Sequence, residues 1–142
     1  MSVFIFNDQA DAKAVHRAEL PPSIKSEGAL LDALSVALRF PSYFGRNWNA
    51  LDECVRDLSW LPPGNVVLVH KDVPLTDNRA SLAIYLSILR DAVGNWDKKG
   101  SNLIYASAEK WDASGKCELL VKRNFRVIFP TDTRSTVESV LA

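Results

Sequence analysis

A tight turn that leads directly into an amphipathic helix, between Pro41 and Leu58, constrains the fold of this chain more than any other segment. The turn reads Pro-Ser-Tyr-Phe-Gly, and the helix is expected from Asn47 to Leu58. At the helical period, the apolar side chains fall within about a third of the circumference. They are Trp48, Leu51, Cys54, Val55 and Leu58. The opposite side, with Ala50 and Asp57 at its margin, is polar. Its residues are Asn49, Asp52, Glu53 and Arg56. We therefore expect one face to pack against a core and the other to remain accessible.

The remaining chain predicts a layered α/β fold with a small parallel sheet. Apolar runs indicate strands at 3–6, 66–69 and 103–106. Ser26 can cap a helix that ends at Phe40-Pro41, and residues 76–78 can cap another that ends at Gly94-Asn95. Residues 8–25 are expected to form a connection with one short helix around 12–18. The order strand, two helices, strand, helix, strand is typical of a three-stranded parallel sheet covered by helices.

The C-terminal part is expected to extend this core. Residues 117–121 and 125–129 could form a hairpin or add to the sheet edge, and residues 131–141 a short terminal helix capped by Thr131 or Asp132. With 142 residues, the chain is expected to form one domain, with a core at about 1–107 and an extension at 108–142.

Composition limits the classes of partner. Lys plus Arg and Asp plus Glu number 17 each, so the chain lacks the basic surplus typical of direct nucleic-acid binding. No apolar run reaches the roughly 18 residues of a membrane span, and the N-terminus does not resemble a signal peptide. Cys54 and Cys117 do not suggest a disulfide framework or a metal site, and Cys54 falls on the apolar side of its helix. We predict a cytoplasmic protein without a cofactor, metal or membrane contact.

The turn before the helix suggests a protein-binding surface. Tyr43 and Phe44 place two aromatic rings beside a charged helix face, a composition typical of interfaces. Alternatively, these rings only cover the helix entrance, and Trp60 has the same two interpretations. Asn49 and Glu53 are i and i+4 neighbours that could reach the same partner group.

Other chemistry is less well supported. His70 and Asp72 follow a strand and could supply a general base, but no serine or cysteine is linked to them by a motif. We interpret His70 as a loop histidine and predict no catalytic residue. The basic segments 98–100 and 116–123 fit a solvated surface better than an RNA contact, because stacking aromatics are missing apart from Phe125.

The turn and helix resemble the signature of the barstar family, bacterial inhibitors of barnase-like secreted ribonucleases. The residues that carry the resemblance are Tyr43, Phe44, Gly45, Asn47, Ala50, Leu51, Cys54 and Trp60. The resemblance implies a barstar-like fold and a helix whose carboxylates enter a ribonuclease active site in place of the RNA phosphate.

Several positions depart from the family pattern. Glu53 matches the main family carboxylate, but the neutral Asn49 matches a second one, and Asp52 stands where the family often has tryptophan. Arg46 replaces an acidic or neutral residue, and it could contact the partner or pair with Asp52 or Glu53. Around position 81, where the family can present an acid from the third helix, this chain has Ser81. These departures predict a target other than barnase itself.

We therefore predict an immunity-type inhibitor of a toxin ribonuclease, as in a toxin–antitoxin pair, and not an enzyme. The alternative is a barstar-like module that binds a partner without nuclease activity. The expected partner-binding residues are Tyr43, Phe44, Gly45, Arg46, Asn47, Asn49, Ala50, Asp52, Glu53, Arg56 and Trp60.

Overall fold

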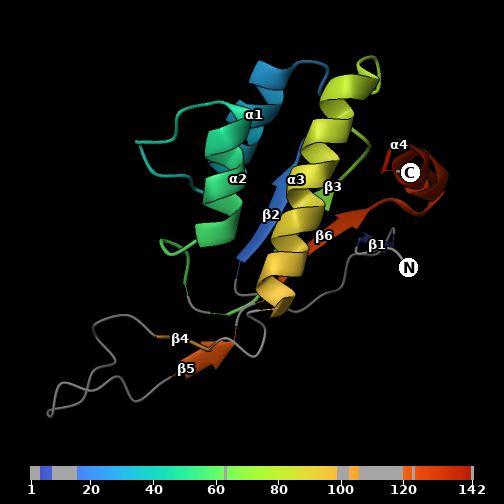
Figure 1. Ribbon diagram of the computed structural model, residues 1–142. Coiled ribbons are helices and arrows are strands. Elements are labelled where there is room, and N and C mark those ends of the chain that lie inside the picture. Colours follow the sequence, from blue (N-terminus) through green and yellow to red (C-terminus); the bar gives the residue numbers. More distant parts are fainter. Residues whose placement is uncertain are drawn as a thin grey trace, which may run out of the picture.

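The computed structural model describes residues 4–7, 16–62, 64–98, 103–105, 120–122 and 124–141. The N-terminal half contains β1 (Ile5–Phe6), β2 (His16–Leu20), α1 (Glu27–Ala37), α2 (Trp48–Asp57) and β3 (Val66–His70). The remainder contains α3 (Arg79–Lys98), β4 (Leu103–Tyr105), β5 (Leu120–Lys122), β6 (Phe125–Phe129), a 3₁₀ turn (Thr131–Thr133) and α4 (Arg134–Leu141). Figure 1 shows α2 and α3 side by side in front of the strands.

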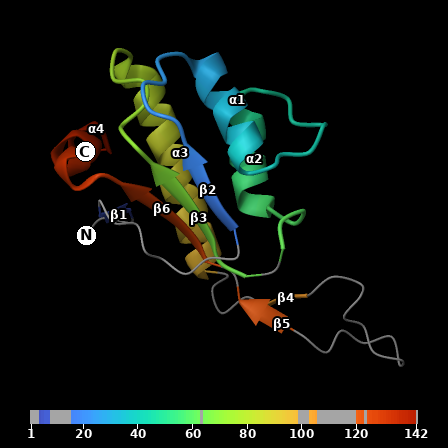
Figure 2. The same ribbon diagram turned by 180° about the vertical axis from the view of Figure 1, so that it is seen from behind.

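The main sheet has four strands in the order β1-β6-β3-β2, and all neighbouring pairs are parallel. The predicted α/β class with a parallel sheet is confirmed, but the expected number of three strands is wrong. Alternate strand residues, such as Val66, Leu68 and Val127, join the buried side chains of α1, α2 and α3 in one core. The intervening residues Val67, Val69 and Ile128 form a small separate cluster. Hence α1, α2 and α3 pack on the same face of the sheet, which Figure 2 shows from behind.

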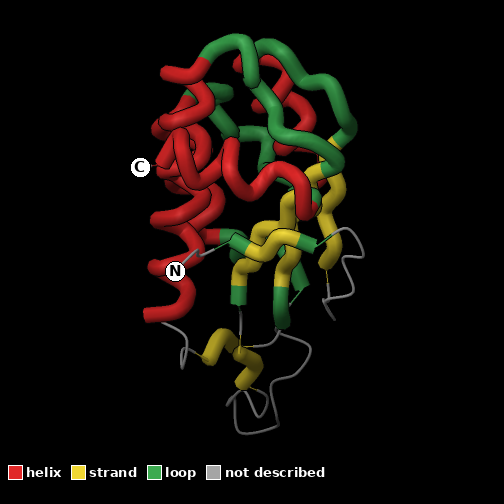
Figure 3. The backbone as a smooth tube through the Cα atoms, turned by 90° about the vertical axis from the view of Figure 1, so that its right-hand side faces the viewer, coloured by secondary structure: helices red, strands yellow, loops and turns green. Residues whose placement is uncertain are grey.

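The C-terminal strand β6 occupies the interior of the sheet, between β1 and β3. The prediction that residues 125–129 form a hairpin or an edge strand is therefore wrong. In this position the side chains of Phe125, Val127 and Phe129 are completely buried. The predicted strand at 103–106 exists as β4, but it pairs antiparallel with β5 in a separate two-stranded sheet. Figure 3 shows this pair apart from the main sheet.

The prediction of a helix around residues 12–18 is wrong for residues 16–18, because the structure shows that residues 16–20 form the strand β2. Buried and exposed side chains alternate along His16–Leu20, the period of a strand with one face on the core. β2 pairs with β3 in register from His16 opposite Val66 to Leu20 opposite His70. Residues 12–15 lie outside the described part of the chain.

Ser26 and Asn78 cap the starts of α1 and α3 as predicted, but α1 ends at Ala37, before the predicted end at Phe40-Pro41. Ser26 Oγ accepts a hydrogen bond from the Ala29 N–H at 3.1 Å, and Asn78 Oδ1 accepts one from Ser81 at 3.2 Å. However, α3 does not end at Gly94-Asn95 but continues to Lys98. Trp96 explains the extension, because its ring is buried and its Nε1 donates to Val55 O of α2 at 2.9 Å.

The predicted terminal helix is confirmed as α4, which begins after the 3₁₀ turn. Thr131 and Asp132 lie inside this turn, which has no side-chain cap, so neither is the cap of α4. Arg134 of α4 stacks over the ring of Phe6, with its guanidinium carbon 4.7 Å from the ring centroid. In the part of the chain that the structure describes, no helix combines the length and the apolar character of a membrane span.

Candidate protein-binding site

Asn47 joins the turn to α2 and sets the direction of both. Its Oδ1 accepts the N–H of Ala50 at 2.7 Å, and its Nδ2 donates to the carbonyl oxygen of Gly45 at 3.4 Å. The helix then buries Leu51, Cys54 and Val55, as the periodicity predicted. Asn47 therefore links the turn to the first turn of α2 by hydrogen bonds.

Replacing Asn47 with alanine should destabilise the protein by about 1 kcal/mol, because one N–H of the first turn of α2 loses its acceptor. Urea unfolding measures this loss. Asn47→Ser is the control, since serine also caps and should restore most of the stability. Equal stability of the alanine variant and the unmodified protein would contradict a capping role.

The three aromatic residues of the predicted site differ in exposure. Tyr43 is 71% exposed, whereas Phe44 and Trp60 are half-buried. The Phe44 and Trp60 rings pack on Phe40, with centroids 4.7 and 5.9 Å away, and Trp60 Nε1 donates to Leu38 O at 2.9 Å. Phe44 and Trp60 thus pack on the segment that follows α1, while Tyr43 presents an accessible ring.

The turn approaches the helix closely at Gly45. A Cβ atom at this position would lie 3.6 Å from Ala50 Cβ and 3.3 Å from Asn47 Nδ2, leaving little room for a side chain. The next residue, Arg46, has a left-handed backbone with φ of 53°. Its guanidinium pairs with Asp32 of α1 at 2.7 Å, not with Asp52 or Glu53. Arg46 therefore does not neutralise a carboxylate of α2.

The acidic residues of α2 fall into two groups. Asp52 pairs with Arg56, whose Nη2 lies 2.9 Å from its carboxylate. Glu53 and Asp57 are exposed, and within the described ranges no ion pair or hydrogen bond involves either carboxylate. These two residues carry the free negative charge of the helix.

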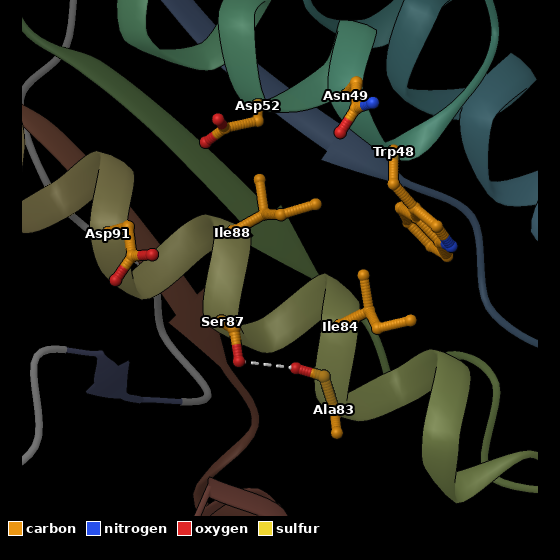
Figure 4. A pocket seen from close by; sticks show the side chains of 8 residues that line it. All are labelled: Trp48, Asn49, Asp52, Ala83, Ile84, Ser87, Ile88 and Asp91. Carbon is orange, nitrogen blue, oxygen red and sulfur yellow. Dashed lines mark hydrogen bonds between the residues drawn. The ribbon is translucent and has the colours of Figure 1, made fainter.

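A groove of about 410 Å³ lies between α2 and α3 and is lined by residues of both helices. At one end, Asp52 and Asp91 project from the two helices, and at the other Trp48 lies near Ile84 (Figure 4). Ser87 lines the groove, but its hydroxyl donates to the Ala83 carbonyl of its own helix at 2.8 Å. The groove thus combines an apolar part with an acidic end.

A smaller hollow of about 210 Å³ lies on the other flank of α2, toward the turn. It is lined by Tyr43, Phe44, Ala50, Glu53, Cys54 and Asp57. Asn49 lines the groove instead, one helical turn before Glu53, and the expectation that the two side chains can reach the same partner group stays a prediction.

Desolvation, followed by the charges around this hollow, perturbs its titratable groups. Burial, and then the negative charges of Asp57 and Glu53, raise the pKa of the Cys54 thiol. The predicted buried cysteine is confirmed, and its thiol stays protonated at neutral pH. Desolvation, followed by the charge of Asp57, raises the pKa of Tyr43.

Asp91 is a residue of this surface that sequence reasoning missed. Ser81, where an acid from the third helix was sought, is buried, and its hydroxyl donates to the carboxylate of Glu27. Asp91 belongs to the stripe of α3 that faces α2, whose residues follow the spacing i, i+3, i+4 and i+7. They are Ile84, Ser87, Ile88 and Asp91. This spacing was the signal available in the sequence.

His70 is the last residue of β3 and is buried, so its interpretation as a loop histidine is wrong. Its Nδ1 donates to Ile128 O at 3.2 Å, its Nε2 accepts the hydroxyl of Tyr85 at 2.7 Å, and its ring stacks on Phe129 at 4.0 Å. Burial lowers the pKa of His70 to about 3. Both ring nitrogens are occupied, which leaves neither for a substrate proton. Asp72 accepts the N–H of Ser23 at 2.8 Å.

The structure describes the remaining parts of the predicted chemistry only in part. Among the described residues, no group of three or more His, Cys, Asp or Glu side chains could hold a metal ion. The basic segments 98–100 and 116–123, as well as Cys117, lie largely outside these residues.

Fold and surface together define a small α/β protein that presents a turn and a helix with free carboxylates. The family model "Barstar (barnase inhibitor)" matches residues 15–108, about two thirds of the chain. The chain therefore belongs to the barstar family, as the turn and helix motif predicted. Neither the curated proteins nor the solved structures gave a match. The matched segment contains the turn and α2, whereas β6 and α4 lie beyond it.

Proposed function

We propose that this protein is a stoichiometric inhibitor of a ribonuclease and occludes the active site of that enzyme with the turn at 41–46 and α2. The observation that carries the proposal is the free, exposed carboxylate of Glu53 beside the exposed ring of Tyr43, on the helix that the family signature covers. A ribonuclease active site is built to stabilise the negative charge of a phosphate, so a rigidly held carboxylate can occupy it.

The local structure supports this role by limiting the cost of binding. The Asn47 cap, the Trp60 hydrogen bond and the packing of Phe44 on Phe40 restrict the motion of the surface before a partner arrives. A surface that is already ordered loses less conformational entropy on association. In this arrangement, Glu53 is the main anionic group and Tyr43 the main apolar contact. Asp52 and Asn49 contribute from the side of the α2–α3 groove, and Gly45 lets the partner approach the turn.

The pairing of charges suggests what kind of ribonuclease is bound. Arg46 and Arg56 each pair with an aspartate of this chain, and Asn49 is neutral, so Glu53 and Asp57 carry most of the free charge of the surface. A surface with only two free carboxylates complements fewer positive charges than a surface with several. It therefore suits a ribonuclease whose active site is less basic. We propose a toxin ribonuclease other than barnase, with this protein acting as the immunity partner in the cytoplasm of the producing cell.

A titration of barnase-like ribonucleases with this protein tests the proposal. We expect RNA cleavage by the cognate enzyme to fall to zero at one equivalent. Glu53→Ala should weaken inhibition by roughly 30-fold or more, the effect of losing a hot-spot residue of about 2 kcal/mol.

Glu138→Ala is the matched control, because Glu138 is also an exposed helical glutamate but lies on α4. It should inhibit as well as the unmodified protein. Equal inhibition by the Glu53→Ala variant would contradict the assigned role of Glu53. A tight partner without nuclease activity, recovered where no ribonuclease is inhibited, would favour the alternative of a barstar-like binding module.

A further inference from the structure

The main sheet ends on one side at β2. This strand pairs with β3, and no other strand of the described ranges pairs with it; Figure 2 shows it at one edge of the sheet. The His16 N–H donates to the Asn65 carbonyl at 3.4 Å, so the backbone groups of His16 and of every second residue after it point toward β3. The N–H and C=O groups of the residues between them, Arg17 and Glu19, therefore point to the outer side of β2.

Arg17 and Glu19 carry the charges of this outer edge. Their side chains are exposed, whereas the side chains that alternate with them along β2 are buried. Within the chain, Arg17 Nη2 lies 3.3 Å from the Glu19 carboxylate, and the two side chains are 39% and 52% exposed. An ion pair this exposed stabilises a fold little. The edge of β2 thus presents one positive and one negative side chain, with the small Ala18 between them.

This charge pattern is complementary to itself. Two copies of a strand can pair antiparallel around a two-fold axis, and their hydrogen bonds form where outward-pointing backbone groups face each other. If the axis passes through Ala18, Arg17 of each copy lies opposite Glu19 of the other, and both charge pairs are favourable. An axis at Arg17 or at Glu19 would instead place like charges opposite each other. Pro21 limits the pairing beyond the C-terminal end of β2, because proline has no N–H.

We propose that two copies of this chain associate through β2 in antiparallel orientation, with Ala18 at the two-fold axis. The Arg17 N–H donates to the Glu19 carbonyl of the second copy, and the Glu19 N–H donates to the Arg17 carbonyl of that copy. Bonds that these two residues form within a single chain are exchanged for bonds to the second copy. The contact joins the two four-stranded sheets into one. It uses neither α2 nor the turn at 41–46, so it does not rest on the proposed function.

Sedimentation equilibrium of the full chain tests this proposal at protein concentrations from about 10 μM to about 1 mM, a range suited to a small interface. We expect a reversible equilibrium between monomer and dimer. Hydrogen exchange followed by NMR should show slower exchange of the Arg17 and Glu19 amides as the dimer fraction rises. Glu19→Arg should weaken the dimer about tenfold or more, because both symmetry-related charge pairs become repulsive. The double variant Arg17→Glu/Glu19→Arg should restore the dimer, since it again places opposite charges across the axis.

Glu138→Arg is the matched control. Like Glu19, Glu138 is exposed and pairs with an arginine of its own element, Arg134 at 3.4 Å, but it lies on α4. This variant changes the net charge equally and should leave the dissociation constant of the dimer unchanged. A chain that stays monomeric over the whole concentration range, in which Arg17 and Glu19 only protect the edge of the sheet, would overturn the proposal. A dimer that Glu19→Arg does not weaken, or that the double variant does not restore, would also overturn it.

Discussion

Acidification from pH 7 to pH 4 should destabilise the folded protein by about 3 kcal/mol through His70 alone. The imidazole is buried, accepts a hydrogen bond from the Tyr85 hydroxyl and donates one to the Ile128 carbonyl, and burial outweighs the latter bond, which favours the charged form. Burial lowers its pKa in the folded state from 6.5 to about 3. Between these two values the unfolded chain binds a proton that the folded chain excludes. Stability is therefore complete above about pH 6.5 and decreases as the pH falls toward 3.

Chemical unfolding at a series of pH values measures this effect, and a His70→Gln variant isolates it. Glutamine cannot be protonated in this range, although its amide can accept the Tyr85 hydroxyl. The variant should be less stable at pH 7, because the contacts of the ring are lost, but its stability should change much less between pH 6.5 and pH 4. A variant with the same pH dependence as the unmodified protein would show that His70 is not responsible.

Phe129→Ala should destabilise the protein by about 3–5 kcal/mol, the usual cost of removing a large aromatic side chain from a packed core. The Phe129 ring is fully buried at the end of β6. It lies 5.4 Å from the Phe4 ring, 6.1 Å from Phe6 and 4.0 Å from His70. The substitution would therefore leave a cavity where β1, β3 and β6 meet. Urea unfolding followed by circular dichroism measures the loss.

Ser135→Ala is a suitable control, since Ser135 is exposed on α4 and its replacement should change stability little. A loss of less than about 1 kcal/mol for Phe129→Ala would mean that β6 is peripheral, against the packing described above. That the whole chain forms a single domain stays a prediction, and a single cooperative transition in both variants would support it. Because β6 lies beyond the family match at 15–108, the expected loss of stability would also show that a segment outside this match contributes to the fold.

Much of the architecture could be predicted because it depends on local signals. The spacing of Leu51, Cys54 and Val55 predicted the buried face of α2, and Asn47 was recognised at its beginning. The apolar run at 66–69 predicted β3, which is buried along its full length. The family signature lies in the same local segment, so the turn and the helix also identified the family. Each of these features depends on residues that are close to each other in the sequence.

Other features required contacts between distant segments. The cap signal at Gly94-Asn95 was overridden by Trp96, which is buried and hydrogen-bonded to α2. The alternation in His16–Leu20 was too short to predict β2 until β3 provided its pairing partner. Residues 125–129 gave a strand pattern, but the choice between edge and interior depended on β1 and β3.

Some features of the candidate site could likewise be predicted from the sequence, whereas others depended on the folded structure. The residue types along Tyr43 to Trp60 indicated an acidic and aromatic surface, because the helical period alone decides which side chains share the exposed face of α2. Only the folded chain decides which acids are free: Arg46 pairs with Asp32 of another helix, and α3 brings Asp91 beside Asp52. Helical periodicity is a property of neighbouring residues, whereas the neighbours of a strand and the partner of a charge are chosen by the packing free energy of the whole molecule.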